Sequence, residues 1–235
     1  METDSILLIP GLLCDGYVWG PLLDRLGHQG VVADLTTQDS ISQMASDCLV
    51  LADGPLAVAG HSMGGRVAME MARMAPHRIE RLALLDTGIH PLSEGEPERR
   101  AEMVRLAWEK GMDALADRWL PGMVWHGNHS NARLMSELRE MVLRQDPKRH
   151  ERQINALVGR PDASAYLSKI TCPTLLVAGR YDNWSPVSQH EDMLALLPDA
   201  TLQIIEDAGH FAPVEQPSTV ARLLADFLHQ KDIKV

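Results

Sequence analysis

The chain has 235 residues, of which 45% are hydrophobic and 23% charged, and its formal net charge at pH 7 is −10. This composition is that of a globular protein with a self-sufficient core. The acidic balance argues against nucleic acid or an anionic membrane surface as a partner.

Cysteine usage and the first residues of the chain bear on location. The three cysteines, Cys14, Cys48 and Cys172, have no spacing typical of a metal site, so we expect free thiols in a reducing cytoplasm and no bound metal. The opening "METDSILLIPG" is acidic and has only a short apolar run, which predicts a strand rather than a signal peptide. The sequence offers no apolar stretch of the length that a membrane span needs. We therefore predict a cytoplasmic protein. We also expect it to be a monomer or a homodimer.

Short apolar runs alternate with amphipathic stretches over residues 1–90. We expect strands in the runs "SILLIPG" (5–11), "GVVADLT" (30–36), "LAVAG" (56–60) and "RLALLDTG" (81–88). Between them, helical spacing predicts helices over 18–27, 40–52 and 63–75. Strands that are apolar without alternation, separated by helices, indicate a parallel sheet covered on both faces.

The alternation of predicted strands and helices stops after residue 90. Residues 91–165 contain no strand-like run and repeat apolar side chains at helical spacing, which predicts a helical cap inserted after the fourth strand. Alternation returns in 166–235, with strands expected in 174–182 and 200–210 and helices over 187–197 and 218–230. The predicted class is α/β, with a core formed by residues 1–90 and 166–235 and a cap formed by 91–165.

The stretch "VAGHSMGGRVAMEMA" (58–72) places Ser62 between a predicted strand and a predicted helix. A sharp turn there would hold the serine in a strained backbone conformation, and Gly60 and Gly64 would remove the Cβ atoms that collide. The start of the helix would favour an anionic intermediate, and the Met63 N–H would point toward a developing oxyanion. The alternative is an ordinary serine helix cap between incidental glycines.

A serine nucleophile needs a base and a group that orients the base. Of the ten histidines, His210 follows the last predicted strand and so lies at the same sheet edge as Ser62. Asp182, after the fifth strand, is the preferred acid, and Asp86, at the end of the fourth, is the competitor. His61 would point away from the serine and pack.

The remaining candidates concern the oxyanion and the pocket. The Leu12 N–H, in the loop after the first strand, is the expected second oxyanion donor. Residues next to these segments or in the irregular part of the cap are expected to bind substrate: Leu13, Trp125, Trp184 and Phe211. The cap histidines His126 and His129 could touch substrate or be plain surface residues. We see no cluster of basic residues for a carboxylate or phosphate, although three arginines could serve singly: Arg66, Arg160 and Arg180.

Four segments resemble the motifs of the α/β-hydrolase superfamily, in particular its small esterase and lactonase branch. They are "GHSMGG" (60–65) for the nucleophile turn, "AGRYDNWSP" (178–186) for the acid, "AGHFAPVEQP" (208–217) for the histidine and "PGLLCDGYVW" (10–19) for the oxyanion loop. The resemblance spans about residues 5–230 and implies Ser62 as nucleophile, His210 as base and Asp182 as acid. It also implies Leu12 and Met63 as oxyanion donors and activity without a cofactor.

The chain departs from the family pattern at two places. It has Pro10 and Gly11 where a His-Gly pair is commoner, and its first strand corresponds to the third strand of the family. The resemblance therefore implies six strands in the order 2-1-3-4-5-6. The expected activity is hydrolysis of esters or lactones of small, largely apolar molecules through an acyl-enzyme. A C–C or thioester hydrolase with the same triad, or a weakly catalytic ligand-binding protein, remains open.

Overall fold

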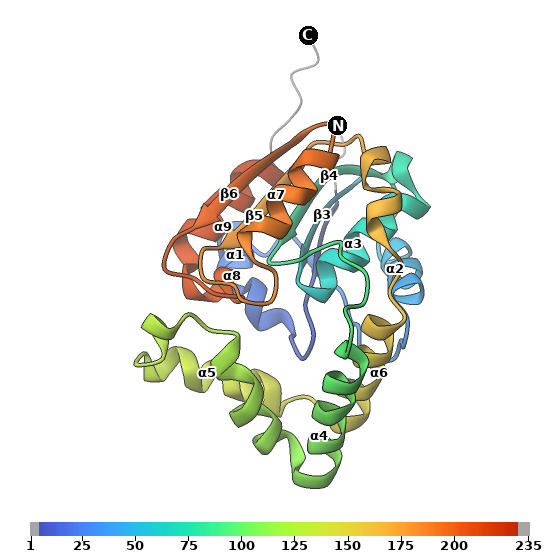
Figure 1. Cartoon of the computed structure of the whole chain (residues 1–235). Coiled ribbons are helices and arrows are strands. Elements are labelled where there is room, and N and C mark those ends of the chain that lie inside the picture. The colour runs from blue at the N-terminus through green and yellow to red at the C-terminus, as the bar shows by residue number, and fades with distance from the viewer. Residues whose placement is uncertain (1–4, 230–235) are drawn as a thin grey trace.

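The computed structural model describes residues 5–229 and has a parallel β-sheet at its centre (Figure 1). Six strands lie in the order β2-β1-β3-β4-β5-β6, and every neighbouring pair is parallel. The strands are β1 (Ser5–Ile9), β2 (Val31–Val32), β3 (Leu56–His61), β4 (Ile79–Leu85), β5 (Thr174–Gly179) and β6 (Ala200–Ile205). This confirms the predicted α/β class and strand order.

Helices cover both faces of the sheet. On one face α1 (Gly20–Arg25) packs against α9 (Pro217–Leu228). On the other lie α2 (Ile41–Leu49), α3 (Met63–Met74) and α7 (Val187–Leu196). Within residues 5–229 no helix combines the length and the apolar character needed to cross a bilayer.

Burial on two faces explains why the strands read as uninterrupted apolar runs. In β1, Ile6 and Leu8 belong to the core beside α1 and α9, whereas Leu7 and Ile9 belong to the core beside α2 and α3. Successive side chains of a strand point to opposite faces, so a sheet covered on both sides needs an apolar residue at every position. Removal of this surface from water is the main force that holds the layers together.

Several boundaries differ from those expected. The second strand is only Val31–Val32, and the fourth ends at Leu85 because Asp86 has a φ of 46°, outside the β region. A short helix that the sequence did not predict, α8 (Ala212–Glu215), precedes α9. The last helix ends at Leu228, and the predicted end at residue 230 lies outside the described residues.

Between β4 and β5 the chain forms a helical cap below the sheet in Figure 1. Its helices are α4 (Glu96–Trp119), α5 (Ala132–Leu143) and α6 (Pro147–Val158), and α4 packs against both of the others. The backbone of α4 leaves the helical conformation at Gly111, where φ is 83°. A glycine adopts this conformation without steric cost, so the two arms of α4 can differ in direction. The structure confirms a helical insertion after the fourth strand.

Candidate active site

Ser62 occupies the turn between β3 and α3. Its φ of 54° and ψ of −115° are unusual for a residue with a side chain. A Cβ at Gly60 would collide with the backbone of Gly64, and a Cβ at Gly64 would collide with the carbonyl of Ile9. The two glycines therefore let the helix start against the sheet, and the serine projects from the turn.

Hydrogen bonds hold this strained residue in place. The Ser62 N–H donates to the carbonyl of Leu85 at 2.8 Å, and the Thr87 hydroxyl donates to the Ser62 carbonyl at 2.7 Å. Both partners belong to the neighbouring strand β4 or the residues just after it. The conformation of the serine is thus fixed by the sheet as well as by its own helix.

The structure brings Ser62, His210 and Asp182 into one line of hydrogen bonds. The Nε2 atom of His210 lies 2.8 Å from Ser62 Oγ, and its Nδ1 lies 2.7 Å from Asp182 Oδ2. The three residues follow β3, β6 and β5, so the carboxyl edge of the sheet collects them from distant parts of the chain. Such a line can move a proton from the hydroxyl to the imidazole.

The Asp182 carboxylate is held ionised in a buried place. Burial opposes its ionisation, but His210 and the backbone N–H groups of Ser185 and Trp184 outweigh it, so its pKa is lowered. These N–H groups donate to Oδ1 at 3.0 and 2.7 Å. An ionised carboxylate at Nδ1 keeps the proton on that nitrogen and leaves Nε2 free to accept one.

The competing acid, Asp86, has a different environment. Its carboxyl group accepts hydrogen bonds from the N–H groups of Gly179 at 2.8 Å and Ala212 at 3.3 Å. Burial, together with the charge of Asp182, raises its pKa well above the usual range. Asp86 therefore joins the end of β5 to the segment after His210, and the orienting position is filled by Asp182.

The other histidine at the turn, His61, packs beneath the site. Its Nε2 donates to the carbonyl of His210 at 2.7 Å, and its ring stacks on Phe211. Burial lowers the pKa of His61 to about 3, so the ring is neutral near pH 7. The cap histidines His126 and His129 are exposed and do not line the cavity above Ser62.

The two residues expected to supply the oxyanion donors lie at the wall of the cavity. Leu12 and Met63 both line the cavity that contains Ser62 and His210. In the described part of the chain neither N–H donates to a protein acceptor. A Cβ at Gly11 would press on His61 and Ser62, so a glycine is needed for the loop to approach the serine this closely.

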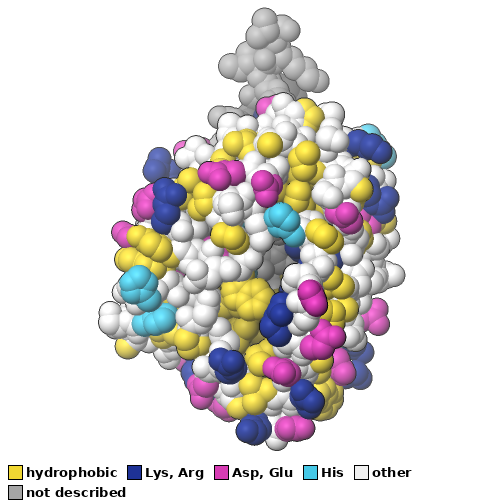
Figure 2. Space-filling model, in the orientation of Figure 1, with side chains coloured by type: hydrophobic (Ala, Val, Ile, Leu, Met, Phe, Trp, Pro, Cys, Tyr) yellow, Lys and Arg dark blue, Asp and Glu magenta, His cyan; other side chains and the backbone are white. Residues whose placement is uncertain are grey.

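A cavity of about 720 Å³ opens above the serine, between the sheet edge and the cap. Figure 2 shows this face hollowed, with hydrophobic and basic side chains next to the hollow. Of the four residues expected to bind substrate, Trp184 lines the cavity. The other three do not: Leu13 and Phe211 have 0% exposure in the core, and Trp125 stacks on Tyr181. Adjacency in sequence to a catalytic segment was a poor guide, because these side chains turn toward the core or a neighbouring ring.

Comparison with known proteins agrees with this geometry. A model of the alpha/beta hydrolase family matches residues 6–223. The chain belongs to this family. Among curated relatives, it is 28% identical over 250 residues to a pimeloyl-(acyl-carrier protein) methyl ester esterase of Photobacterium profundum, covering 97% of this chain and 95% of that protein.

Solved structures of other members superpose closely. An esterase from Thermogutta terrifontis has a TM-score of 0.88 and 26% identity, covering 97% of this chain and 91% of that one. The enol-lactonase from Burkholderia xenovorans LB400 has a TM-score of 0.87 at 23% identity, covering 98% and 93% of the two chains. The second similarity concerns the fold alone.

In this alpha/beta hydrolase, Glu215 is a site residue that the sequence did not single out. Its carboxylate accepts hydrogen bonds from the N–H groups of Gly209 at 2.8 Å and Trp125 at 2.9 Å. The His210 N–H also donates to the carbonyl of Met123 at 2.8 Å. The cap segment 123–125 and the histidine loop are therefore one hydrogen-bonded unit. The motif "AGHFAPVEQP" contained the residue, but nothing in it revealed the distant partner.

The expectation that no basic cluster exists is corrected by the structure. Five arginines line the cavity of this hydrolase: Arg66, Arg99, Arg100, Arg118 and Arg160. They come from α3, from α4 and from the second residue after α6, so the separation of these segments along the chain concealed their proximity. Arg180, the third arginine weighed from the sequence, pairs instead with Glu206 on the surface.

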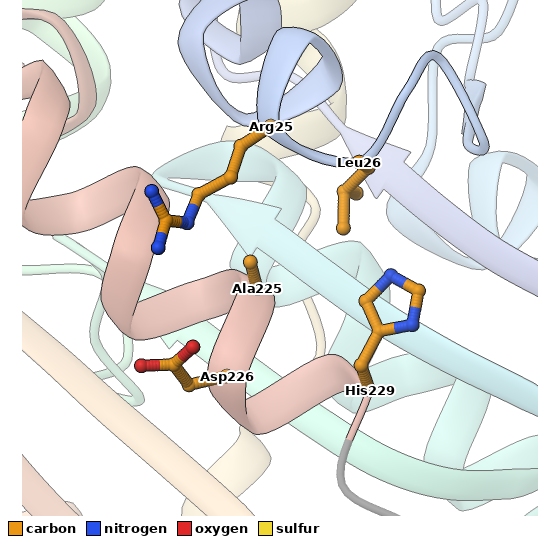
Figure 3. Close-up of a pocket in the computed structure, with 5 residues that line it drawn as sticks. All are labelled: Arg25, Leu26, Ala225, Asp226 and His229. Atoms are coloured by element: carbon orange, nitrogen blue, oxygen red, sulfur yellow. The ribbon is translucent and has the colours of Figure 1, made fainter.

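A second hollow lies away from the serine. It is lined by Arg25, Leu26, Ala225, Asp226 and His229, at the ends of α1 and α9 (Figure 3). None of the residues around Ser62 contributes to it. Its lining provides no hydroxyl or thiol, whereas the cavity above Ser62 contains the aligned serine and histidine.

Proposed function

We propose that this protein is a serine hydrolase that cleaves carboxylic esters or lactones of small molecules through an acyl-enzyme. The line from Ser62 Oγ through His210 to Asp182, with distances of 2.8 and 2.7 Å, carries the proposal. Related proteins named esterases, one similar along nearly the whole chain, support the reaction class.

In the first step Ser62 Oγ attacks the carbonyl carbon while its proton moves to His210 Nε2. The N–H groups of Leu12 and Met63 stabilise the negative charge that develops on the carbonyl oxygen. The leaving alcohol takes the proton from His210, and the acyl group stays on the serine. Water, activated by the same imidazole, then attacks the acyl-serine and regenerates the hydroxyl.

The lining of the cavity has an apolar part and a charged part. The apolar part would contact the hydrocarbon portion of the substrate and is formed by Leu12, Met63, Met103, Trp119, Met123 and Ile154. The expectation of a largely apolar substrate fits this part only. The charged part contains five arginines, which an apolar substrate alone would not contact.

Replacement of the nucleophile tests the proposal. Ser62→Ala should lower kcat for p-nitrophenyl esters by roughly 10⁴-fold or more. A fluorophosphonate probe should label the native protein once and leave Ser62→Ala unlabelled. A variant that retained a tenth of the activity would exclude Ser62 as the nucleophile.

Two further outcomes separate this activity from its alternatives. Labelling without turnover of any ester or lactone would indicate that the same serine cleaves thioester or C–C bonds. Absence of labelling in folded protein would indicate a ligand-binding protein on this fold. A panel of esters, lactones, thioesters and diketones, assayed beside the labelling, distinguishes these cases.

A further inference from the structure

Arg66 lies one helical turn after Ser62, on α3, and lines the same cavity. The Arg66 N–H donates to the Ser62 carbonyl at 3.4 Å, so the arginine and the nucleophile are neighbours. Its Nη2 donates to the carbonyl of His90 at 3.3 Å. Its Nη1 is buried and has no hydrogen-bond partner among the described residues. A buried donor of a charged group without an acceptor is costly, and a ligand atom would remove that cost.

The neighbouring arginines already have a partner. Arg160 donates from Nη1 and Nη2 to the two carboxylate oxygens of Glu96, at 2.8 and 2.9 Å. Arg100 donates from Nε to Glu96 Oε1 at 2.8 Å. One carboxylate thus serves two guanidinium groups, and Arg66 adds a third positive charge beside them. The cavity has an excess of positive charge in a chain whose net charge is −10.

The electrostatic state of Arg66 agrees with a role in binding an anion. Burial, followed by repulsion from Arg160, lowers the pKa of Arg66, so its charged form is destabilised in this place. The Arg100 guanidinium also lies over the ring of Trp184, at 5.8 Å from the centroid. These contacts hold the arginines next to Arg66 in defined positions, and preorganised groups favour tight recognition.

We propose that Arg66 binds a carboxylate group that the substrate carries in addition to its scissile ester or lactone bond. The proposal rests on the proposed function for the place of the reacting carbonyl, at Ser62. A guanidinium matches a carboxylate through paired N–H donors. A monoanion fits better than a doubly charged phosphate, because Glu96 offsets part of the positive charge of the cluster. The substrate class is accordingly half-esters of dicarboxylic acids, or lactones that bear a carboxylate.

Matched substrates test this preference. The monomethyl esters of succinic, glutaric and adipic acids can be compared with methyl butyrate, pentanoate and hexanoate, which have the same chain lengths but no carboxylate. We expect kcat/KM for the best half-ester to exceed that of its neutral match by at least about tenfold. In Arg66→Met this ratio should fall by roughly 10- to 100-fold. Arg180→Met, at an arginine outside the cavity, is the matched control and should leave the ratio unchanged.

A binding experiment is independent of turnover. Titration of Ser62→Ala with monomethyl adipate by calorimetry should show binding that Arg66→Met weakens at least tenfold, with Arg66→Lys in between. If circular dichroism shows that Arg66→Met is unfolded, Arg66→Lys alone tests the proposal. Its affinity for monomethyl adipate should then be lower than that of Ser62→Ala alone by about threefold or more. Equal preference for neutral and anionic esters in the native protein, or stronger binding of inorganic phosphate than of the half-ester, would overturn the proposal. Carboxylate binding without ester turnover would uphold this subsite and reject the proposed hydrolysis.

Discussion

The Glu215 carboxylate and the Trp125 backbone join the histidine loop to the cap, although 90 positions separate the two residues in the sequence. Glu215 Oε2 accepts the Trp125 N–H at 2.9 Å, and Oε1 accepts the N–H groups of Gly209 at 2.8 Å and Phe211 at 3.2 Å. The residues on either side of His210 are thus fixed by a carboxylate that also holds the cap. Asn128 adds a side-chain hydrogen bond to the same group at 3.0 Å.

Glu215→Gln should therefore lower both stability and activity. One carboxylate oxygen becomes an NH₂ group that faces an N–H donor, which costs about 1–3 kcal/mol in free energy of unfolding. Displacement of the His210 loop should lower kcat by roughly tenfold or more. Urea unfolding and ester hydrolysis measure the two effects. Asn128→Ala removes the side-chain hydrogen bonds to Glu215 and to the Asp207 carbonyl, leaves the backbone donors of Glu215 in place and should cost less. Equal losses in the two variants would contradict this account.

The two buried aspartates should respond differently to the same change. Asp182→Asn presents an amide to His210 Nδ1 and favours the tautomer that cannot accept the serine proton, so kcat should fall by roughly 10³- to 10⁴-fold. Asp86→Asn leaves the carboxylate that contacts His210 Nδ1 in place, so kcat should fall by less than about tenfold. Steady-state kinetics on one ester compares them. A larger loss in Asp86→Asn would reverse the assignment of the acid.

The nucleophile turn should not tolerate a methyl group. Gly64→Ala places a Cβ against the carbonyl of Ile9, which is backbone and cannot move aside, so we expect a loss of at least about 2 kcal/mol in free energy of unfolding. At Gly20 a Cβ meets nothing within 4 Å and φ is −47°, so Gly20→Ala should be neutral or stabilising by up to about 1 kcal/mol. Thermal or urea unfolding distinguishes the pair. Similar effects at both positions would refute the steric argument.

The Glu96 cluster should make stability depend on pH in a defined direction. Burial opposes ionisation of Glu96, but Arg160, the Ser93 N–H and Arg100 outweigh it and lower its pKa from 4.5 to about 2. Its contribution is therefore present above pH 4.5 and lost as the pH falls toward 2.

Replacement of this carboxylate exposes that dependence. At pH 7, Glu96→Gln should unfold with about 1.5–3 kcal/mol less free energy than the native protein. The difference should shrink steadily between pH 5 and pH 3 in urea titrations at a series of pH values. Arg133, exposed and paired with Glu137, provides a control: Glu137→Gln should leave the free energy of unfolding at pH 7 close to that of the native protein, because water screens an exposed ion pair. A Glu96→Gln deficit independent of pH would disprove the linkage.

The sheet and the three aligned side chains were predictable because their signals are local. Buried parallel strands need apolar residues at successive positions, and the glycines around Ser62 follow from the steric demands of one turn. The residues that end each strand are brought to one edge by parallel topology, so Asp182 and His210 could be placed without coordinates. The sequence favoured Asp182 but kept Asp86 as a competitor, because both lie between Ser62 and His210 in the chain and both follow a predicted strand.

The pocket was not predictable, because its walls come from side chains whose direction depends on tertiary packing. Leu13 follows directly on Leu12 yet points into the core, where its N–H donates to Gln153 at 2.9 Å. Arg66 and Arg160 are separated by most of the cap, and Glu96, the partner of Arg160, lies at the start of α4. Neither composition nor spacing encodes such encounters between a cap and a sheet.

The attachment of segment 123–125 to the histidine loop divides the cap into two regions for protein engineering. One region is this segment, and the other is formed by the helices α4 and α6. Substitutions on the cavity-facing sides of α4 and α6 can change the substrate range, because those helices line the cavity but do not position His210. Changes that shift the backbone of 123–125 alter the imidazole itself, whatever molecule is chosen. Libraries for new selectivity should therefore vary the two helices and leave that short connection intact.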